Sequence, residues 1–210
     1  LQAALKTHPT LTEAIAFLDR VLGVSSSLTG FAMDNMTRDD GWRFLIIGRR
    51  LERLSFLANA IGNFLRMPSA RGPGSLEWLL ELADSIITYR SRYSRLPELL
   101  PVIDLLVFDD SNPHGVVFQG SVLARYLDRM GRELGDHSES SLPDVLSRLR
   151  AFSLEPLEHL QFSECRTCPP CEELADLLKE LDAAAVQLSA RLGMRYFTHV
   201  GDVSRQTMAL

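Results

Sequence analysis

Hydrophobic residues recur every three or four positions along most of this chain, which is the spacing of one face of an α-helix. Four long segments show this pattern, and we predict a helix over each of them: residues 10–36, 41–66, 75–93 and 172–196. The sequence contains no stretch with the strict apolar–polar alternation typical of a half-buried strand. The pattern therefore predicts an all-α protein.

Capping residues mark where some of these helices begin. Thr10 and Glu13 have the spacing of a capping box, in which the two side chains satisfy free backbone N–H groups of the first turn. Asn112 and Pro113 fit the N-cap and the first position of a further helix, which we expect to run to about residue 134. The other apolar segments are shorter and lie at 97–108 and 143–157.

The connections between these segments are short, so neighbouring helices are expected to be antiparallel, as in a helical bundle. We predict one helical domain over residues 1–210, with 1–9 as a linker and 198–210 as a polar tail. The domain should contain about five to seven mostly antiparallel helices. The chain begins at Leu1 rather than at a methionine, so we expect it to be the C-terminal fragment of a longer region.

Composition agrees with this fold and excludes some functions. The chain has 36 Leu against 18 Ile plus Val, and leucine is the better helix former of these. A formal net charge of −5 argues against sequence-independent binding to nucleic acid. No run approaches the roughly 18 consecutive apolar residues of a membrane span, and no secretory signal is recognised. We therefore expect a cytoplasmic protein without a membrane or nucleic-acid partner.

The helix predicted at 41–66 carries charges in an unusual place. On a helical wheel Arg49 and Arg53 fall near the middle of the apolar arc, beside Phe56, and Glu52 falls at its edge. Charged residues are rarely buried unless they are paired. We therefore predict that all three are largely buried and that Glu52 accepts hydrogen bonds from an arginine. Removing Glu52 is then expected to cost about 3–5 kcal/mol.

Two other predicted helices repeat this feature. Arg90 falls on the apolar face of 75–93, and Arg195 falls on that of 172–196, as would His199 if the helix continued. One glutamate cannot neutralise several guanidinium groups, so another anion is required. Three readings stay open. The charges form a structural network that sets helix register, or a pocket that binds a carboxylate or phosphate, or the centre of an enzyme in its own right.

Four separated segments together resemble the Alpha-E domain, a predicted all-helical bacterial family named for its Glu-Arg motif. The first is Gly48-Arg49-Arg50-Leu51-Glu52-Arg53, preceded by MTRDDGWRFL. The others are YRSRY at 89–93, DDSNP at 109–113 and RYFTHV at 195–200, so the resemblance spans about residue 34 to the C-terminus. It makes Arg49, Glu52 and Arg53 the signature residues. The candidates in the other segments are Arg90, Asp109, Asn112 and Arg195.

The resemblance implies a context more than a reaction. Alpha-E domains occur beside, or fused to, circularly permuted ATP-grasp domains that resemble carboxylate–amine ligases, often with transglutaminase-like proteins. It implies a helical accessory domain of a peptide or amide ligase system, which binds an anionic substrate or partner and needs no cofactor of its own. The sequence has no P-loop or G-x-G-x-x-G motif, so we expect this fragment not to be catalytic alone.

Cys165, Cys168 and Cys171 form a C-x2-C-x2-C motif. This spacing suits an iron–sulfur cluster, but a fourth ligand is needed and the chain has no fourth cysteine. We therefore predict that no metal is bound there and that the thiols are incidental members of an irregular loop. With three cysteines the chain is not built on a disulfide framework.

Overall fold

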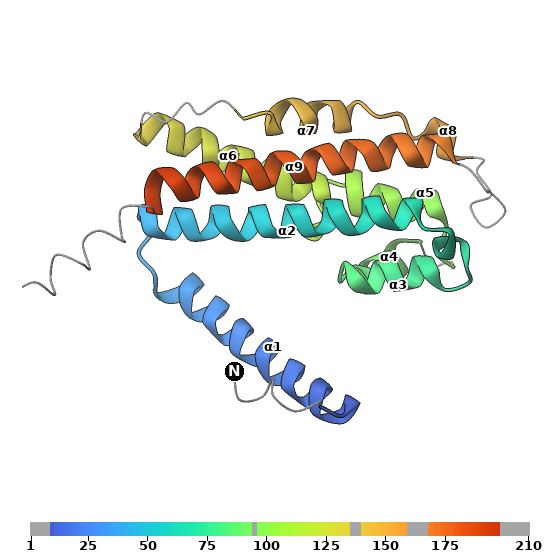
Figure 1. Ribbon diagram of the computed structural model, residues 1–210, viewed down its shortest axis with the longest axis horizontal. Coiled ribbons are helices and arrows are strands. Elements are labelled where there is room, and N and C mark those ends of the chain that lie inside the picture. Colours follow the sequence, from blue (N-terminus) through green and yellow to red (C-terminus); the bar gives the residue numbers. More distant parts are fainter. Residues whose placement is uncertain (1–8, 94–95, 135–139, 159–167, 198–210) are drawn as a thin grey trace, which may run out of the picture. The chain divides into compact units, whose positions relative to one another are not determined.

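The computed structural model describes residues 9–93, 96–134, 140–158 and 168–197, and within these ranges it contains helices and turns but no strand (Figure 1). The all-α prediction is therefore confirmed. The helices in chain order are α1 (Leu11–Asn35), α2 (Asp40–Arg66), η2 (Pro68–Arg71), α3 (Ser75–Leu82), α4 (Ile86–Tyr93), α5 (Leu99–Ile103), the π-helix η3 (Asp104–Phe108), α6 (Val116–Leu134), α7 (Leu142–Arg150), α8 (Glu155–Glu158) and α9 (Pro169–Phe197).

The chain divides into two compact units, residues 1–45 and 46–210, which are described separately. In the first unit, the predicted capping box is present: Thr10 Oγ1 accepts a hydrogen bond from the Glu13 backbone N–H, and the Glu13 carboxylate accepts one from the Thr10 N–H. The prediction of one domain over 1–210 stays a prediction.

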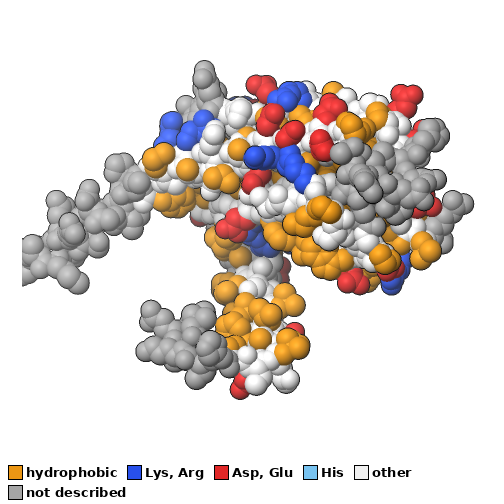
Figure 2. Space-filling view, turned by 45° about the vertical axis from the view of Figure 1, so that its right-hand side comes forward, with side chains coloured by type: hydrophobic (Ala, Val, Ile, Leu, Met, Phe, Trp, Pro, Cys, Tyr) orange, Lys and Arg blue, Asp and Glu red, His pale blue; other side chains and the backbone are white. Residues whose placement is uncertain are grey.

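Helix α1 exposes an apolar surface (Figure 2). None of its 25 residues is buried, and the side chains of Leu11, Leu22 and Phe31 are each at least 65% exposed. By length and composition α1 is the one described helix that could cross a membrane. Core helices of soluble proteins and signal sequences also meet these length and composition criteria.

The second unit is organised around α2 and α9, which run antiparallel side by side (Figure 1). Their polar edge is linked by Ser55 and Asn59, which both donate hydrogen bonds to the Asp182 carboxylate, and by an Arg66–Asp176 ion pair at 2.5 Å. Gly62 allows the two backbones to approach, because a Cβ there would lie 3.4 Å from the Ala175 carbonyl oxygen.

The other helices of this unit complete the core. Helices α6 and α7 meet where Gly120 faces Leu146, and a Cβ on Gly120 would lie 2.8 Å from a Leu146 methyl carbon. The π-helix contributes fully buried Leu105 and Leu106 to the interior, next to α5 and α6. The core is leucine-rich throughout, as the sequence pattern predicts.

Two of the predicted boundaries are wrong. The segment 75–93 is not one helix, because Asp84, just after the end of α3, takes a left-handed conformation (φ 50°), and α4 begins only at Ile86. An aspartate tolerates this conformation better than most residues. Helix α6 begins at Val116 rather than Pro113, because Asn112 is part of a turn in which the Gly115 N–H donates to the Asn112 carbonyl. Such breaks give the described residues more, shorter helices than predicted.

Candidate functional site

Arginines gather around Arg50, where α2 faces α6. The Arg50 guanidinium is half-buried, donates a 2.9 Å hydrogen bond to the Gln119 side-chain oxygen, and lies over the Phe118 ring, 5.7 Å from its centroid. Burial lowers the pKa of Arg50, and the positive charges of Arg53, Arg49 and Arg125 lower it further. We call Arg49, Arg50, Arg53 and Arg125 the arginine cluster.

The arginine cluster differs from other arginines of this unit in its ion pairing. Among the described residues, none of its four members takes part in an ion pair with an aspartate or glutamate. Other arginines of the same unit differ: Arg66 pairs with Asp176, and Arg148 with Glu180 at 2.6 Å. Three guanidinium groups near Arg50 add to its positive charge, and such a local positive potential favours an anion.

The prediction that Arg49, Glu52 and Arg53 are buried is wrong. All three side chains are exposed, and in the described structure Glu52 accepts no hydrogen bond from an arginine. The helical-wheel argument failed because it counted Phe56 as core, although 51% of its surface is exposed. The helix buries most of the predicted apolar arc, including the fully buried Leu54, but not the side that carries Phe56, Arg49 and Arg53.

Glu52 lines a groove of about 640 Å³ between α2 and α9. The groove wall on α2 also includes Ser55 and Phe56, and α9 contributes Val186 and Ser189. Glu52 and the adjacent arginine of the motif are about 100° apart around the α2 axis. The signature segment thus places Glu52 at the α2–α9 groove, while Arg50 of the same segment faces α6.

The structure does not bring Arg90 to this cluster. Arg90 is exposed on α4, and its guanidinium lies 3.6 Å from the Glu77 carboxylate of α3. Arg195 lies in the last turn of α9, with its guanidinium carbon 5.7 Å from the centre of the Tyr196 ring. Asp182 is the α9 residue that contacts Ser55 and Asn59 of α2. Arg195 lies 13 positions further along α9, a separation of about 20 Å along the helix axis. His199 lies outside the described residues.

A second polar cluster joins Asp109 to α4. The Asp109 carboxylate pairs with Arg92 and accepts hydrogen bonds from the Ser111 backbone N–H at 2.8 Å and from its hydroxyl at 2.7 Å. Burial acts to raise the pKa of Asp109, but these hydrogen bonds together outweigh it and hold the pKa below 3.8. The family-like segments YRSRY and DDSNP therefore meet through Arg92 rather than through Arg90.

Asn112 is a buried structural residue in this second cluster. Its side-chain NH2 donates to the Leu105 carbonyl at 3.0 Å and to the Ser85 hydroxyl at 3.3 Å, and its oxygen accepts from the His114 N–H at 3.1 Å. Only 1% of its surface is exposed. These bonds connect the turn after the π-helix to the residue that precedes α4. The Asn112 amide therefore uses both its NH2 group and its oxygen in hydrogen bonds within the protein.

The π-helix positions Asp104 beside the same cluster. Burial raises the pKa of Asp104, and the nearby Asp109 carboxylate adds to the increase, while Arg92 and a hydrogen bond from Tyr93 act against it. Burial likewise raises the pKa of Tyr93. Because its charged members are already paired with one another, this cluster presents bonded groups rather than an open anion site.

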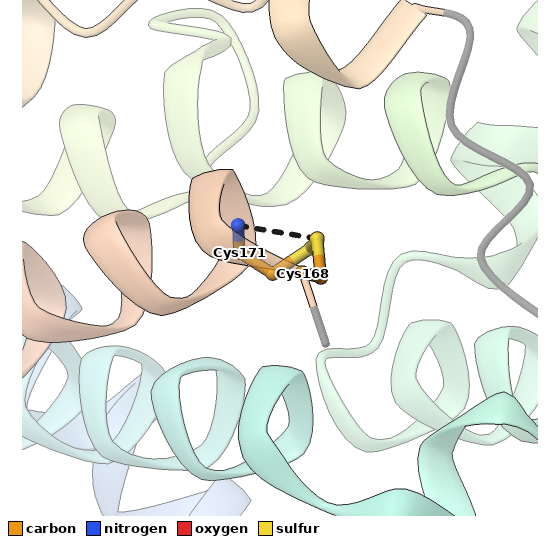
Figure 3. The surroundings of a disulfide bond; sticks show 2 residues. All are labelled: Cys168 and Cys171. Atoms are coloured by element: carbon orange, nitrogen blue, oxygen red, sulfur yellow. Dashed lines mark hydrogen bonds between the residues drawn. A yellow bond between two sulfur atoms is a disulfide. The ribbon is translucent and has the colours of Figure 1, made fainter. Parts of the chain in front are cut away.

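The cysteines differ from the sequence prediction. Cys168 and Cys171 are joined by a disulfide and are both buried at the start of α9, so they are not incidental members of an irregular loop (Figure 3). Cys165 lies outside the described residues. Within the part of the chain that the structure describes, no group of His, Cys, Asp or Glu side chains is arranged to hold a metal ion.

Sequence reasoning did not identify four of the residues at these sites. Arg50 stands inside the signature segment, so the motif could have indicated it, but Gln119 and Arg125 lie on α6 without any sequence signal. Arg92 is part of the YRSRY segment, in which the wheel selected Arg90 instead. Contacts between distant segments were needed to find them.

The fold and the signature define a class of all-helical domains with an exposed Glu-Arg dipeptide on a central helix. The Alpha-E family, described as a predicted alpha-helical domain with a conserved ER motif, matches residues 1–197. The chain belongs to this family. The match begins upstream of the segment from about residue 34 on which the resemblance rests, and the dipeptide Glu52-Arg53 is the single ER in the sequence.

The curated relatives are mycobacterial. The uncharacterized protein Rv2567 of Mycobacterium tuberculosis (strain H37Rv) and the uncharacterized protein Mb2597 of Mycobacterium bovis are each 31% identical to this chain over 162 residues. The aligned part covers 75% of this chain and 18% of each relative, so the chain spans about a fifth of their length. No solved structure matches the chain.

Proposed function

We propose that this Alpha-E chain is a helical accessory domain of an ATP-grasp-type carboxylate–amine ligase system, and that the arginine cluster receives an anionic group of the substrate or of the partner. The observation that carries the proposal is the group of three arginines around half-buried Arg50, none of which forms an ion pair with a described carboxylate. A guanidinium group offers a planar pair of donors that fits a carboxylate or a phosphate.

The position of the signature supports a binding role. A conserved charged motif that is buried and paired would indicate a structural network, but Glu52 and Arg53 are exposed. Exposed charges contribute little to stability, so stability alone gives weak reason to keep them. Because Glu52 lines the α2–α9 groove, the signature segment offers a hydrogen-bond acceptor as well as the guanidinium donors. A peptide with an amine and a carboxylate matches this arrangement.

A division of labour follows. The sequence has no phosphate-binding loop for a nucleotide, so activation by ATP belongs to the ligase partner. A circularly permuted ATP-grasp protein is the partner that the family resemblance implies, with a transglutaminase-like protein as a further one. This chain would dock the substrate or the acceptor, with its anionic group on the arginine cluster.

The structural alternative applies best to the second polar cluster. Asp109 and Asn112 use their hydrogen-bonding groups to hold the turn between η3 and α6. We therefore assign these two residues to the fold and keep Arg49, Glu52 and Arg53 as binding residues.

The test is reconstitution with a circularly permuted ATP-grasp protein from the same genome. ATP-dependent product formation is measured with the wild-type chain, with Arg53→Lys, with Arg125→Gln, and with Arg132→Gln as the control. Arg132 is an exposed arginine of α6 paired with Asp128 at 2.8 Å, seven positions from Arg125. Arg53→Lys and Arg125→Gln should lose the stimulation because they remove guanidinium forks, whereas Arg132→Gln should keep it.

Circular dichroism confirms that each variant folds. If Arg53→Lys and Arg125→Gln fold and support ligation at the wild-type rate, the arginine cluster is not the site, and the reading of these charges as structural is preferred.

A further inference from the structure

Cys168 and Cys171 form a disulfide that the proposed function does not use. The disulfide lies at the start of α9 (Figure 3), the two cysteines flank Pro169 and Pro170 in the sequence, and their Cα atoms are 5.2 Å apart. Cys168 directly precedes α9, and its carbonyl accepts the hydrogen bond of the Glu172 N–H at 2.9 Å, so the disulfide closes the first turn of that helix.

A disulfide that closes so small a loop does not serve mainly for stability. In the chain-entropy account, the stabilisation by a disulfide grows with the length of the loop it closes, and the two cysteines here are only three positions apart. Cys-x-x-Cys pairs at helix starts are instead favourable settings for reversible oxidation, because the helix terminus stabilises a thiolate.

The first turn of α9 directs a donor at Cys168. Pro169 and Pro170 have no N–H group, so the Cys171 N–H is the first backbone donor of the helix. This N–H donates to the Cys168 sulfur over 3.3 Å (Figure 3). The same bond, together with the positive end of the 29-residue helix, would stabilise a thiolate on Cys168 after reduction.

We propose that Cys168 and Cys171 are a reversible thiol–disulfide exchange site whose co-reactant is a dithiol. A thiolate of the dithiol attacks the Cys171 sulfur, forms a mixed disulfide and releases Cys168 as the stabilised thiolate. The second thiol of the dithiol then attacks the dithiol's first sulfur, which is bonded to Cys171 in the mixed disulfide. This step forms the cyclic disulfide of the reagent and releases Cys171 as a thiol. The protein disulfide gains two electrons and two protons, and the dithiol loses them as it becomes a disulfide.

Access to this site requires the first turn of α9 to open. Cys168 and Cys171 are each only 1% exposed, so a reductant cannot reach either sulfur in the closed helix. Terminal turns open locally far more often than a domain unfolds. Exchange is therefore expected without global unfolding, at a rate limited by opening of the turn.

The test is a redox titration of the full chain. Wild type, Cys165→Ser, Cys168→Ser and Cys171→Ser are equilibrated in mixtures of reduced and oxidised dithiothreitol, quenched in acid, alkylated and weighed by mass spectrometry. Wild type and Cys165→Ser should each show one two-electron transition in which two thiols appear together. Cys168→Ser and Cys171→Ser should lose it. Circular dichroism along the titration should show that the helices persist.

Three results would overturn the proposal. The first is loss of the two-electron transition in Cys165→Ser. The second is that Cys168→Ser or Cys171→Ser retains this transition. The third is that the two thiols appear only when circular dichroism shows that the helices are lost. The order of attack has its own readout in the Cys165→Ser background. With an aromatic disulfide at neutral pH, the Cys168 thiol in Cys171→Ser should react faster than the Cys171 thiol in Cys168→Ser, and the reverse order would contradict the assignment.

Discussion

Arg50 and Arg53 are three positions apart on α2, yet their surroundings differ. Arg50 is half-buried and bonded to Gln119, whereas Arg53 is exposed and has no ion-pair partner among the described residues. The sequence alone could identify the signature but not this difference. A helical wheel shows in which direction a side chain leaves the helix, but not which residues of other helices surround it. What each charge contributes depends on the opposite helix.

Glu52→Ala should change the free energy of unfolding by less than about 0.5 kcal/mol, because the carboxylate is exposed and pairs with no described residue. Leu54→Ala, two positions along the same helix, should cost about 2–5 kcal/mol because Leu54 is fully buried. Urea denaturation measures both. A loss of about 3 kcal/mol or more in Glu52→Ala would restore the buried-pair prediction.

Asp109→Asn should lower stability at neutral pH by about 1–2 kcal/mol, since it weakens charge-assisted hydrogen bonds from Arg92 and Ser111. The folded state holds the Asp109 pKa below the ordinary 3.8, so this contribution is present above pH 3.8 and is lost as the pH falls through the folded-state value. Thermal melts from neutral pH to about pH 2.5 should therefore converge for the variant and the wild type.

The exposed neighbour Asp110 supplies the control for this experiment. Asp110→Asn should leave the melting curves close to wild type at every pH. A difference between Asp109→Asn and wild type that persists at the acid end of the series would show that lost packing, rather than lost charge, explains the effect.

The pKa of Asp104 is shifted in the opposite direction to that of Asp109, so its contribution to stability depends on pH in the opposite way. Burial and Asp109 raise its pKa above 3.8, so the folded state holds the proton longer than the unfolded state does. Its protonation favours folding below pH 3.8, and that advantage is lost as the pH rises through the folded-state value. Asp104→Asn should consequently raise the melting temperature at neutral pH, with less gain at about pH 3. An equal change at both pH values would contradict the assignment.

At the scale of elements, periodicity predicted the long helices well and failed where backbone geometry decides. The ends of α1, α2 and α9 lie within about three residues of the prediction, because capping and hydrophobic pattern agree there. The break at Asp84 and the π-helix at 104–108 could not be predicted, since both depend on how α3, α5 and α6 pack together. Local pattern carries no such information.

The glycines of two helices give an element-scale prediction. Gly120→Ala should destabilise the α6–α7 packing, because the new Cβ would lie 2.8 Å from buried Leu146, and overpacking typically costs about 1–3 kcal/mol. Gly193→Ala in α9 meets no atom within 4 Å and should stabilise by up to about 1 kcal/mol through helix propensity. Equal effects of the two substitutions in chemical denaturation would contradict the packing described for Gly120.

At the scale of the molecule, the residues singled out in the sequence separate into different roles. Arg49, Glu52 and Arg53 lie together on the exposed side of α2, Asp109 and Asn112 hold a turn, and Arg90 pairs with Glu77. The signature segment Gly48–Arg53 carries three arginines and one glutamate, which the sequence shows directly. It could not predict that Arg125 of α6 completes the cluster, because residues so far apart along the chain show no common pattern.

The most direct test of the central claim is the melting temperature in increasing pyrophosphate at constant ionic strength, for wild type, Arg53→Gln, Arg125→Gln and the control Arg132→Gln. An anion that binds the folded chain raises the melting temperature with concentration. We expect this rise in wild type and Arg132→Gln, and loss of most of it in Arg53→Gln and Arg125→Gln. The same rise in all four proteins would contradict an anion site at the arginine cluster.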